Sequence, residues 1–220
     1  MGVDALMLYP KINTLWKRDS THKIIEGEYS SEVFKNIIDW TVTEKIDGTN
    51  IRVSWDGATI ELNGRTDNAQ IPEHLLKKLQ QLFTKKNMAK VFGEKTRVVL
   101  YGEGYGPKIQ NGERYTDEVN FILFDALIDD WWLERKNIVD VAKKLNIEVV
   151  PEIKMTGYAD SLIKQCASLL RQTKHGYVAS QINLTAEIEG IVATANPLVL
   201  FRDGTPVKFK LKIKDYRDLK

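Results

Sequence analysis

The chain has 220 residues, of which 43% are hydrophobic and 28% are charged, and its formal net charge at pH 7 is +2. A chain of this length can bury a sizeable core, as one large domain or as one domain with a small appendage. No stretch approaches the roughly 18 consecutive apolar residues of a membrane-spanning helix, so a membrane span is excluded. The near-neutral charge does not suggest a chain that coats nucleic acid through bulk electrostatics, so any such binding requires a local basic face.

The number of cysteines and the first ten residues indicate the cellular compartment of the protein. The single Cys166 excludes an internal disulfide framework and a cysteine-rich zinc site. The first ten residues include Asp4 and lack the basic stretch that opens a secretory signal. We therefore expect a cytoplasmic protein.

The predicted elements, in chain order, mix helices with hairpins. A short capped helix is expected at 30–38, and a strand at 41–45 follows it. Two alternating runs, 51–55 and 58–62, flank Asp56-Gly57 and predict a hairpin. Apolar spacing of three to four residues predicts helices at 72–91, 134–145 and 160–171. Apolar, β-rich runs predict strands at 97–101, 120–127, 187–193, 198–202 and 206–213, with a second Asp-Gly turn between the last two. This order lacks a regular βαβ rhythm and indicates one compact α+β domain with antiparallel sheets flanked by helices.

Lys45 stands at the end of a predicted strand, and Asp47-Gly48 turns the chain into the next strand. Gly48 has no side chain, so a ligand can approach the backbone closely there. A lysine amine becomes a nucleophile only when desolvation or neighbouring cations remove its proton. The last predicted strand supplies cations on one face, because its alternating residues are Lys208, Lys210, Lys212 and Lys214. On these residues alone, a solvated lysine before a turn and lysines that protect a sheet edge remain alternatives.

Six short motifs, in their order along the chain, resemble those of the covalent nucleotidyltransferases, which comprise polynucleotide ligases and mRNA capping enzymes. Lys-Ile-Asp-Gly-Thr-Asn at 45–50 resembles motif I of that superfamily. The other five matches are Asn-Gly-Arg-Thr at 63–66, Tyr-Gly-Glu-Gly at 101–104 (motif III), Phe-Ile-Leu-Phe-Asp at 121–125 (motif IIIa), Glu-Gly-Ile-Val at 189–192 (motif IV) and Lys-Phe-Lys at 208–210 (motif V). The resemblance implies the nucleotidyltransferase (ATP-grasp-like ligase) fold.

The last residue of motif I separates the branches of this superfamily. DNA ligases and capping enzymes typically carry arginine there, whereas the RNA ligase 2 group carries asparagine, as this chain does at Asn50. The stretch 9–19 also resembles the lead-in of RNA ligase 2-like proteins. The resemblance therefore implies an ATP-dependent RNA ligase. A DNA ligase or capping-type domain, and a non-catalytic nucleic-acid-binding module that kept the fold, remain alternatives.

The resemblance also implies a role for each matching residue. Lys45 would attack the α-phosphorus of ATP, while Lys208 and Lys210 would hold the α-phosphate and keep Lys45 partly deprotonated. Because Lys212 shares their face, the register of motif V is open by one step. Phe124 would stack on the adenine, with Phe121 in reserve. The implied ATP or AMP contacts are Glu44, Lys45, Asn50, Arg65, Glu103, Phe124, Glu189, Lys208 and Lys210.

Metal and partners follow from the same resemblance. Asp47, Glu103 and Glu189 would form a carboxylate set that holds Mg²⁺, or Mn²⁺, through water. The implied partner is RNA with 5′-phosphate and 3′-hydroxyl ends. We expect the protein to be a monomer and to have no membrane partner. Because only 215–220 follow the basic strand of motif V, which ends at Lys214, we expect 1–220 to be one adenylyltransferase domain with no separate C-terminal domain. A partner domain or protein is then a candidate for engaging the RNA ends.

Overall fold

The structure of the protein is a computed structural model that describes residues 8–161, 189–212 and 215. These residues fall into two compact units. Unit 1 contains Asp47–Val150 and the segment that ends at Tyr9, and unit 2 contains Pro10–Ile46 and the described residues from Pro151 onward. The chain therefore passes from unit 2 into unit 1 directly after Lys45-Ile46. The expectation of one adenylyltransferase domain over 1–220 stays a prediction.

Unit 1 is built on a six-stranded sheet in which β10-β8-β7-β5-β6 are neighbours and β9 pairs with β8. Every pairing in it is antiparallel except that of β10 with β8. The strands are β5 (Thr49–Trp55), β6 (Ile60–Asn63), β7 (Val98–Tyr105), β8 (Asn120–Ile128), β9 (Trp131–Trp132) and β10 (Glu148–Val149). A 3-10 turn, η3 (Gly112–Arg114), lies in the connection between β7 and β8.

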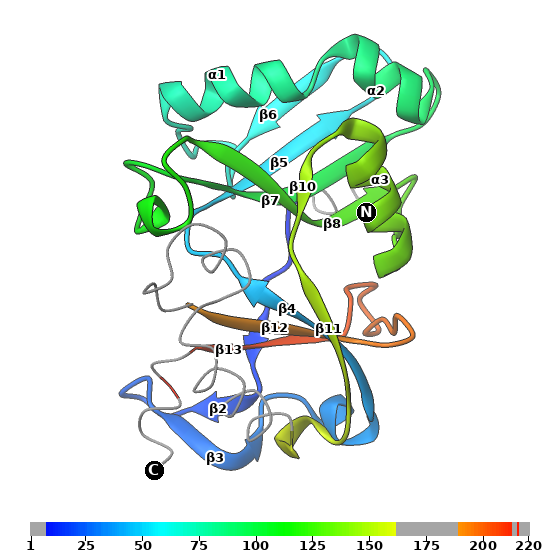
Figure 1. Ribbon diagram of the computed structural model, residues 1–220. Helices are drawn as coiled ribbons and strands as arrows, with labels where there is room; N and C mark the ends of the chain where they lie inside the picture. Colours follow the sequence, from blue (N-terminus) through cyan, green and yellow to red (C-terminus); the bar gives the residue numbers. More distant parts are fainter. Residues whose placement is uncertain (1–7, 162–188, 213–214, 216–220) are drawn as a thin grey trace. The chain divides into compact units, whose positions relative to one another are not determined.

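Three helices pack on one face of this sheet (Figure 1), namely α1 (Glu73–Leu82), α2 (Lys85–Phe92) and α3 (Arg135–Leu145). Their apolar stripes bury Leu75, Met88 and Ile138 against strand residues such as Val53 and Leu100. The single helix predicted at 72–91 is wrong, because the chain forms two helices there. Phe83 leaves the helical conformation, and the Thr84 side chain caps α2 by accepting a hydrogen bond from the backbone N–H of Asn87 at 3.2 Å.

The hairpin predicted around Asp56-Gly57 is confirmed by the antiparallel pairing of β5 with β6. The Asp56 carboxylate accepts hydrogen bonds from the backbone N–H groups of Thr59 and Ala58, at 2.6 and 2.8 Å. These bonds, the one from Thr59 first, lower the pKa of Asp56 to about 2. The Asp56 side chain thus stabilises the turn by bonding to the turn's own backbone.

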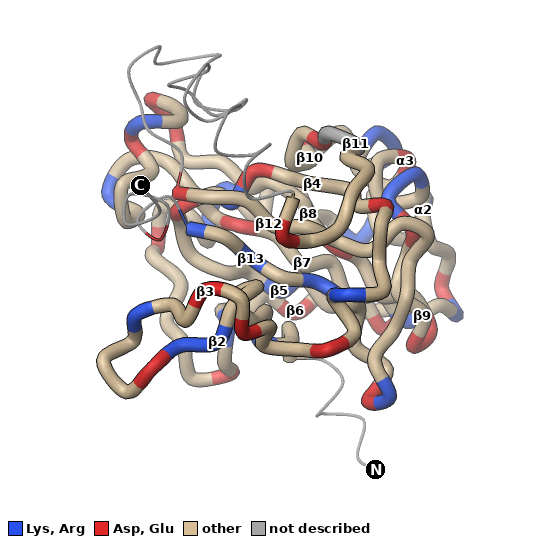
Figure 2. The backbone as a smooth tube through the Cα atoms, turned by 90° about the horizontal axis from the view of Figure 1, so that it is seen from below, with Lys and Arg blue, Asp and Glu red and all other residues tan. Residues whose placement is uncertain are grey.

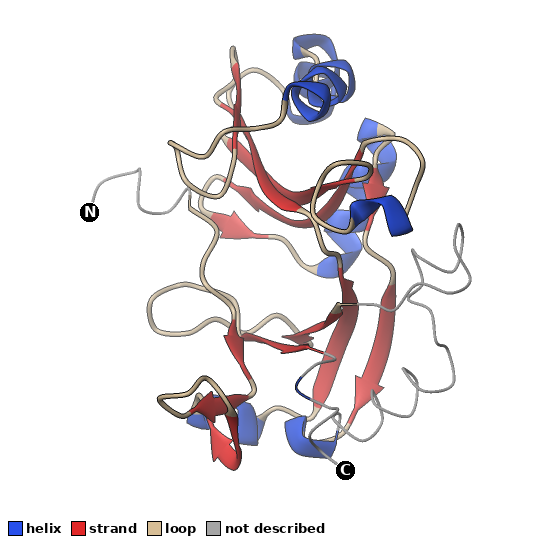
Figure 3. Cartoon of the chain, turned by 90° about the vertical axis from the view of Figure 1, so that its left-hand side faces the viewer, coloured by secondary structure: helices blue, strands red, loops and turns tan. Residues whose placement is uncertain are grey.

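Unit 2 is built on a five-stranded sheet in the order β1-β13-β12-β4-β11, with a separate β2-β3 hairpin. Its strands are β1 (Asn13–Thr14), β2 (Trp16–Arg18), β3 (Ile24–Tyr29), β4 (Asp39–Lys45), β11 (Glu152–Thr156), β12 (Gly190–Ala195) and β13 (Lys208–Lys212). Figure 3 shows how strands dominate this unit. Its core is aromatic, since the Phe34, Trp40 and Phe209 rings meet edge to face.

Two predicted elements of unit 2 differ from the structure. The helix expected at 30–38 is only a 3-10 helix, η2 (Glu32–Asn36), because the backbone is already extended at Ile37 before β4. The strand expected at 198–202 is reduced to one bridge between Leu200 and Pro206, since proline has no N–H to donate to a ladder. The helix predicted at 160–171 lies outside the described residues from 162 onward. No helix in the described part of the chain is long and apolar enough to cross a membrane.

Candidate active site

Lys45, the last residue of β4, lies level with a second lysine across the sheet of unit 2. Gly190 at the start of β12 pairs with Lys45 on one side and with Lys212 of β13 on the other. Directly opposed residues of antiparallel strands project to the same face. The two lysine side chains therefore flank one short segment of β12.

The strand register also places the other lysines of β13, which Figure 2 marks in blue. Lys210 pairs with Val192, one row further along the sheet, and Lys208 pairs with Thr194, two rows further. At the rise of a β-strand these rows lie about 7 and about 14 Å from the row of Lys45. The pairing thus favours the alternative register of motif V, Lys210 with Lys212, over Lys208 with Lys210.

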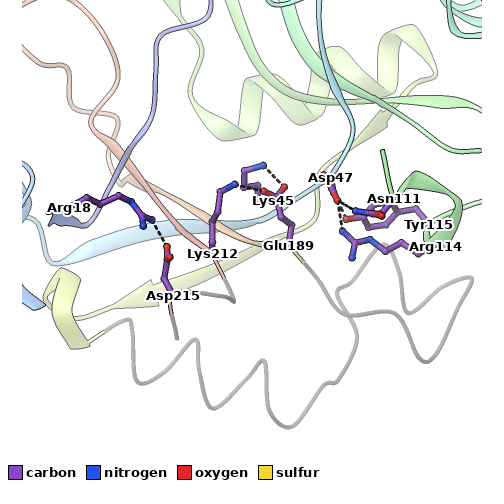
Figure 4. Close-up of polar contacts among 9 residues, drawn as sticks. All are labelled: Arg18, Lys45, Asp47, Asn111, Arg114, Tyr115, Glu189, Lys212 and Asp215. Carbon is purple, nitrogen blue, oxygen red and sulfur yellow. Dashed lines mark hydrogen bonds and ion pairs between the residues drawn. The ribbon is translucent and has the colours of Figure 1, made fainter. Parts of the chain in front are cut away.

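Glu189 joins the two lysines that share the row. Its Oε2 accepts a hydrogen bond from Lys45 Nζ, and its Oε1 accepts one from Lys212 Nζ at 2.8 Å (Figure 4). Burial alone raises the pKa of Glu189, but the hydrogen bonds from Lys212 and Lys45 outweigh burial, so the pKa lies below its usual value. Lys45 is thus paired with Glu189, and a lysine amine becomes a nucleophile only when such a pair opens and its proton leaves.

The shared carboxylate makes a pH-dependent contribution to stability. Glu189→Gln is expected to lower the free energy of unfolding at pH 7 by about 1.5–3 kcal/mol, because an amide cannot form charged hydrogen bonds with both lysines. A carboxyl whose pKa is lowered by folding stabilises fully above its ordinary pKa, 4.5, and loses that effect as the pH falls through the lowered value. Urea unfolding of both proteins from pH 7 to pH 3 should give differences that shrink toward the acid end. A constant difference would contradict the assignment.

Candidate nucleotide contacts of unit 1 share the sheet face opposite the helices. Asn50 of β5 pairs directly with Glu103 of β7, so their side chains are neighbours on one face. The adjacent Ile51 points the other way, into the core beneath the helices. Within the described part of the chain, Asn50 Oδ1 is buried and has no hydrogen-bond partner. A buried acceptor of this kind fits a donor supplied by a ligand, such as a ribose hydroxyl.

A bulge in β8 distinguishes the two candidate aromatic residues. Tyr101 pairs with Asp125 and Gly102 pairs with Leu123, which leaves Phe124 without an opposite residue. Bulges re-aim a side chain and often lie beside active sites. Phe124 is partly exposed, and its ring lies 5.0 Å from that of Tyr9. Phe121, by contrast, is fully buried in the core under the helices, so it is not available to a ligand.

Glu44 and Arg65 are the remaining predicted nucleotide contacts. Glu44 is buried and alternates with Lys45 along β4, so its side chain points to the opposite face and its backbone is the better candidate. Arg65 is exposed just after β6, and the structure gives no role for it. The nearby Asp67 pairs with the buried Arg52. Sequence reasoning missed Arg52, although it lies two residues after Asn50 and so on the same face of β5.

Asp47, predicted as a metal ligand, already has three partners within unit 1. Its Oδ2 accepts hydrogen bonds from Asn111 Nδ2 at 2.8 Å and from Arg114 Nη2 at 3.0 Å, and its backbone N–H donates to the Tyr115 hydroxyl at 3.0 Å. Figure 4 shows these side chains converging on Asp47. Nothing in the sequence pointed to the three partners.

Two residues of the predicted metal set already pair with cationic side chains of the protein. No group of three or more His, Cys, Asp or Glu side chains that could hold a metal occurs among the residues described. Asp47 is paired with Arg114, and Glu189 is paired with two lysines. Mg²⁺ is often held by one or two carboxylates together with substrate phosphates, so a cation that arrives with a nucleotide remains compatible with these residues.

Comparison with known proteins finds one matching family model and several similar structures, all described as RNA ligases. A family model described as RNA ligase matches residues 38–211. A Naegleria gruberi RNA ligase structure with PPi matches with a TM-score of 0.63 and 17% identity, over 96% of this chain and 63% of that chain. A lysine-to-alanine mutant of the Naegleria protein with ATP and Mn matches with a TM-score of 0.63 and 18% identity, over the same shares. An archaeal ATP-dependent RNA ligase matches with a TM-score of 0.61 and 14% identity, over 94% of this chain and 48% of that chain.

These likenesses concern the fold, because all three identities are low. They confirm the expected α+β nucleotidyltransferase architecture with antiparallel sheets and flanking helices. The chain spans 63% of the Naegleria protein's length, which is less than two thirds. No curated protein sequence matches the chain significantly.

Proposed function

The chain belongs to the RNA ligase family, and we propose that it is an ATP-dependent RNA ligase. The observation that carries the proposal is the pairing of Lys45 and Lys212 with the one carboxylate of Glu189. These contacts join motifs I and IV to the strand of motif V. The similar structures that contain PPi, or ATP and Mn, support ATP and a divalent cation, Mg²⁺ or Mn²⁺, as its cofactors.

Three steps follow from this assignment. Lys45 Nζ, once it has lost its proton, attacks the α-phosphorus of ATP; the new bond is P–N, and the bond to the pyrophosphate oxygen breaks. AMP then passes from Lys45 to the 5′-phosphate of RNA, which frees the lysine. Finally the 3′-hydroxyl attacks that 5′-phosphate and expels AMP, which leaves a phosphodiester bond. In such transfers the protein contributes mainly positioning and compensation of charge.

The chain's own residues divide these tasks. Glu189 holds Lys45 Nζ before reaction, and Lys212 holds the other oxygen of Glu189. Lys210, one row away, is our candidate for the α-phosphate, while Asn50 and Glu103 are candidates for the ribose. Phe124 would stack on the adenine, an interaction worth about 1–3 kcal/mol in other nucleic-acid-binding proteins.

The proposed substrate is RNA with a 5′-phosphate and a 3′-hydroxyl end. Asn50 at the last position of motif I supports RNA, and a protein tells RNA from DNA through contacts with the 2′-hydroxyl. A partner domain or protein remains a candidate for holding the RNA ends. We further propose that the protein acts as a monomer in the cytoplasm, which is consistent with its single Cys166.

Two assays test the function. Intact mass spectrometry after incubation with ATP and Mg²⁺ should reveal an AMP adduct, whereas GTP should give no adduct. Nicked duplexes whose 3′-hydroxyl strand ends in ribonucleotides should then be sealed faster than those ending in deoxyribonucleotides. Equal sealing, or sealing of the all-DNA nick alone, would favour a DNA ligase, and a GMP adduct would favour a capping enzyme. An adduct without sealing would indicate that RNA-end engagement needs a partner.

The register of β13 gives a prediction about its lysines. Lys212→Met is expected to slow adduct formation by about 100-fold, because it removes the cation that shares Glu189 with Lys45. Lys208→Met keeps most of the buried side chain, lies two rows away and should slow the reaction much less. Single-turnover adduct formation measures both. A larger effect at Lys208 would restore the first register of motif V.

A further inference from the structure

We propose that Asn111, Arg114 and Tyr115 form a clamp on the turn that follows Lys45, and that Asp47 is a positioning residue held by this clamp rather than a metal ligand. The inference deepens the proposed function and rests on it in one respect, since Lys45 is the residue whose position the clamp serves.

The clamp holds one residue through both its backbone and its side chain. The Tyr115 hydroxyl accepts the backbone N–H of Asp47, while Asn111 and Arg114 donate to the same carboxylate oxygen, Oδ2. The Asp47 and Arg114 side chains are only 22% and 21% exposed, so solvent screens this ion pair less than a pair on the surface. These three contacts, two to Oδ2 and one to the backbone nitrogen, fix the orientation of Asp47 as well as its place.

The loop that supplies these contacts is itself tightly folded. Successive backbone hydrogen bonds link Ile109 to Gly106, Gly112 to Ile109 and Tyr115 to Gly112, at 3.2, 2.8 and 3.0 Å. Gly112 lies so close to Gly106 that a Cβ on it would be 2.4 Å from the Gly106 nitrogen. Tyr115 is fully buried and packs edge to face on Tyr105. Contacts within the loop therefore hold the residues that bind Asp47 in place.

This arrangement uses the charge of Asp47 within the protein. The carboxylate is compensated by the Arg114 guanidinium, and a cation at Oδ2 would have to displace two hydrogen bonds. Asp47 lies two residues after Lys45 in the chain, at the point where the chain enters unit 1. Holding Asp47 thus fixes one end of the short segment that carries the nucleophile. Misplacing a reacting group by about 1 Å can cost about 100-fold in rate.

Substitutions at the two ends of the ion pair test the clamp. Asp47→Asn keeps an acceptor oxygen and should retain adduct formation within about tenfold of the wild-type rate, whereas Asp47→Ala and Arg114→Ala should each lose about 10- to 100-fold. The double variant Asp47→Ala/Arg114→Ala should be no slower than Asp47→Ala alone, because both changes remove the same interaction. The Mg²⁺ concentration for half-maximal rate should stay within about twofold throughout. Arg97→Ala, which breaks the exposed pair with Asp130, is the matched control and should react normally.

The opposite pattern would overturn the proposal. If Asp47→Asn were as slow as Asp47→Ala and needed much more Mg²⁺, while Arg114→Ala reacted normally, Asp47 would be a metal-site residue. Amide hydrogen exchange gives a readout that needs no activity: Arg114→Ala and Tyr115→Phe should each speed exchange at Asp47 by about tenfold or more, and unchanged exchange in both would refute the clamp. A wild-type protein that forms no adduct would refute the proposed function, while the exchange measurement would still decide the clamp.

Discussion

Lys45→Ala is expected to abolish the AMP adduct completely while leaving the fold intact. Lys45 ends β4 on the sheet face that it shares with Lys212, and Glu189 holds its amine beside that second cation. No described lysine besides Lys212 shares this carboxylate, and Lys212 belongs to another strand. The residual rate should therefore fall below detection in intact mass spectrometry with ATP and Mg²⁺.

A matched lysine serves as the control for this prediction. Lys35 also lies in unit 2 and also forms an ion pair, with Glu32 at 2.7 Å, but that pair is exposed on η2. Lys35→Ala should form the adduct at the normal rate, and circular dichroism should show both variants folded. An adduct that persists in Lys45→Ala would mean that another nucleophile is used.

Gly48→Ala is expected to have the second largest effect. A Cβ at Gly48 would lie 2.3 Å from the carbonyl oxygen of Gly104 and 2.9 Å from Cγ of Glu103. Gly104 belongs to the backbone of β7, so it cannot turn aside as a flexible side chain would. The methyl group should therefore push the turn away from β7, cost about 1–3 kcal/mol in the free energy of unfolding and slow adduct formation by about 100-fold.

Gly27→Ala separates this steric effect from ordinary backbone strain. Gly27 in β3 has φ +85°, and a Cβ there meets no atom within 4 Å. Its substitution should lower stability through backbone strain alone and leave the adduct rate unchanged. Equal rates for Gly48→Ala and Gly27→Ala would show that the close approach at Gly48 does not matter.

Local signals allowed much of this site to be predicted. Asp56-Gly57 specified the β5-β6 hairpin because a turn of that type needs little from the rest of the chain. Alternation in β13 predicted that its lysines share one face, and this holds because Phe209 and Leu211 fill the core on the other face. The strand end at Lys45 could be predicted for the same reason, since Asp47-Gly48 stops β4 locally.

The rest depends on contacts between distant parts of the chain. Which lysine lies level with Lys45 is decided by the register of β12, which pairs with both flanking strands. Phe124 and Phe121 could not be told apart because the bulge in β8 appears only when β7 pairs with it. The clamp on Asp47 comes from a loop more than 60 residues further along, and no local pattern relates the two.

The sharing of Glu189 by two lysines has a consequence for which anions the site admits. Lys45, Glu189 and Lys212 together carry a net charge of +1, so an incoming anion meets ammonium groups that are already partly compensated. To bind the lysines, the anion must displace the Glu189 carboxylate. Its gain in binding free energy is the difference between the lysines' attraction for the anion and their attraction for Glu189. A small monovalent anion gains little from that exchange. A polyphosphate, whose linked groups carry several charges, gains considerably more. We therefore expect the shared carboxylate to favour multiply charged phosphate chains over small monovalent anions.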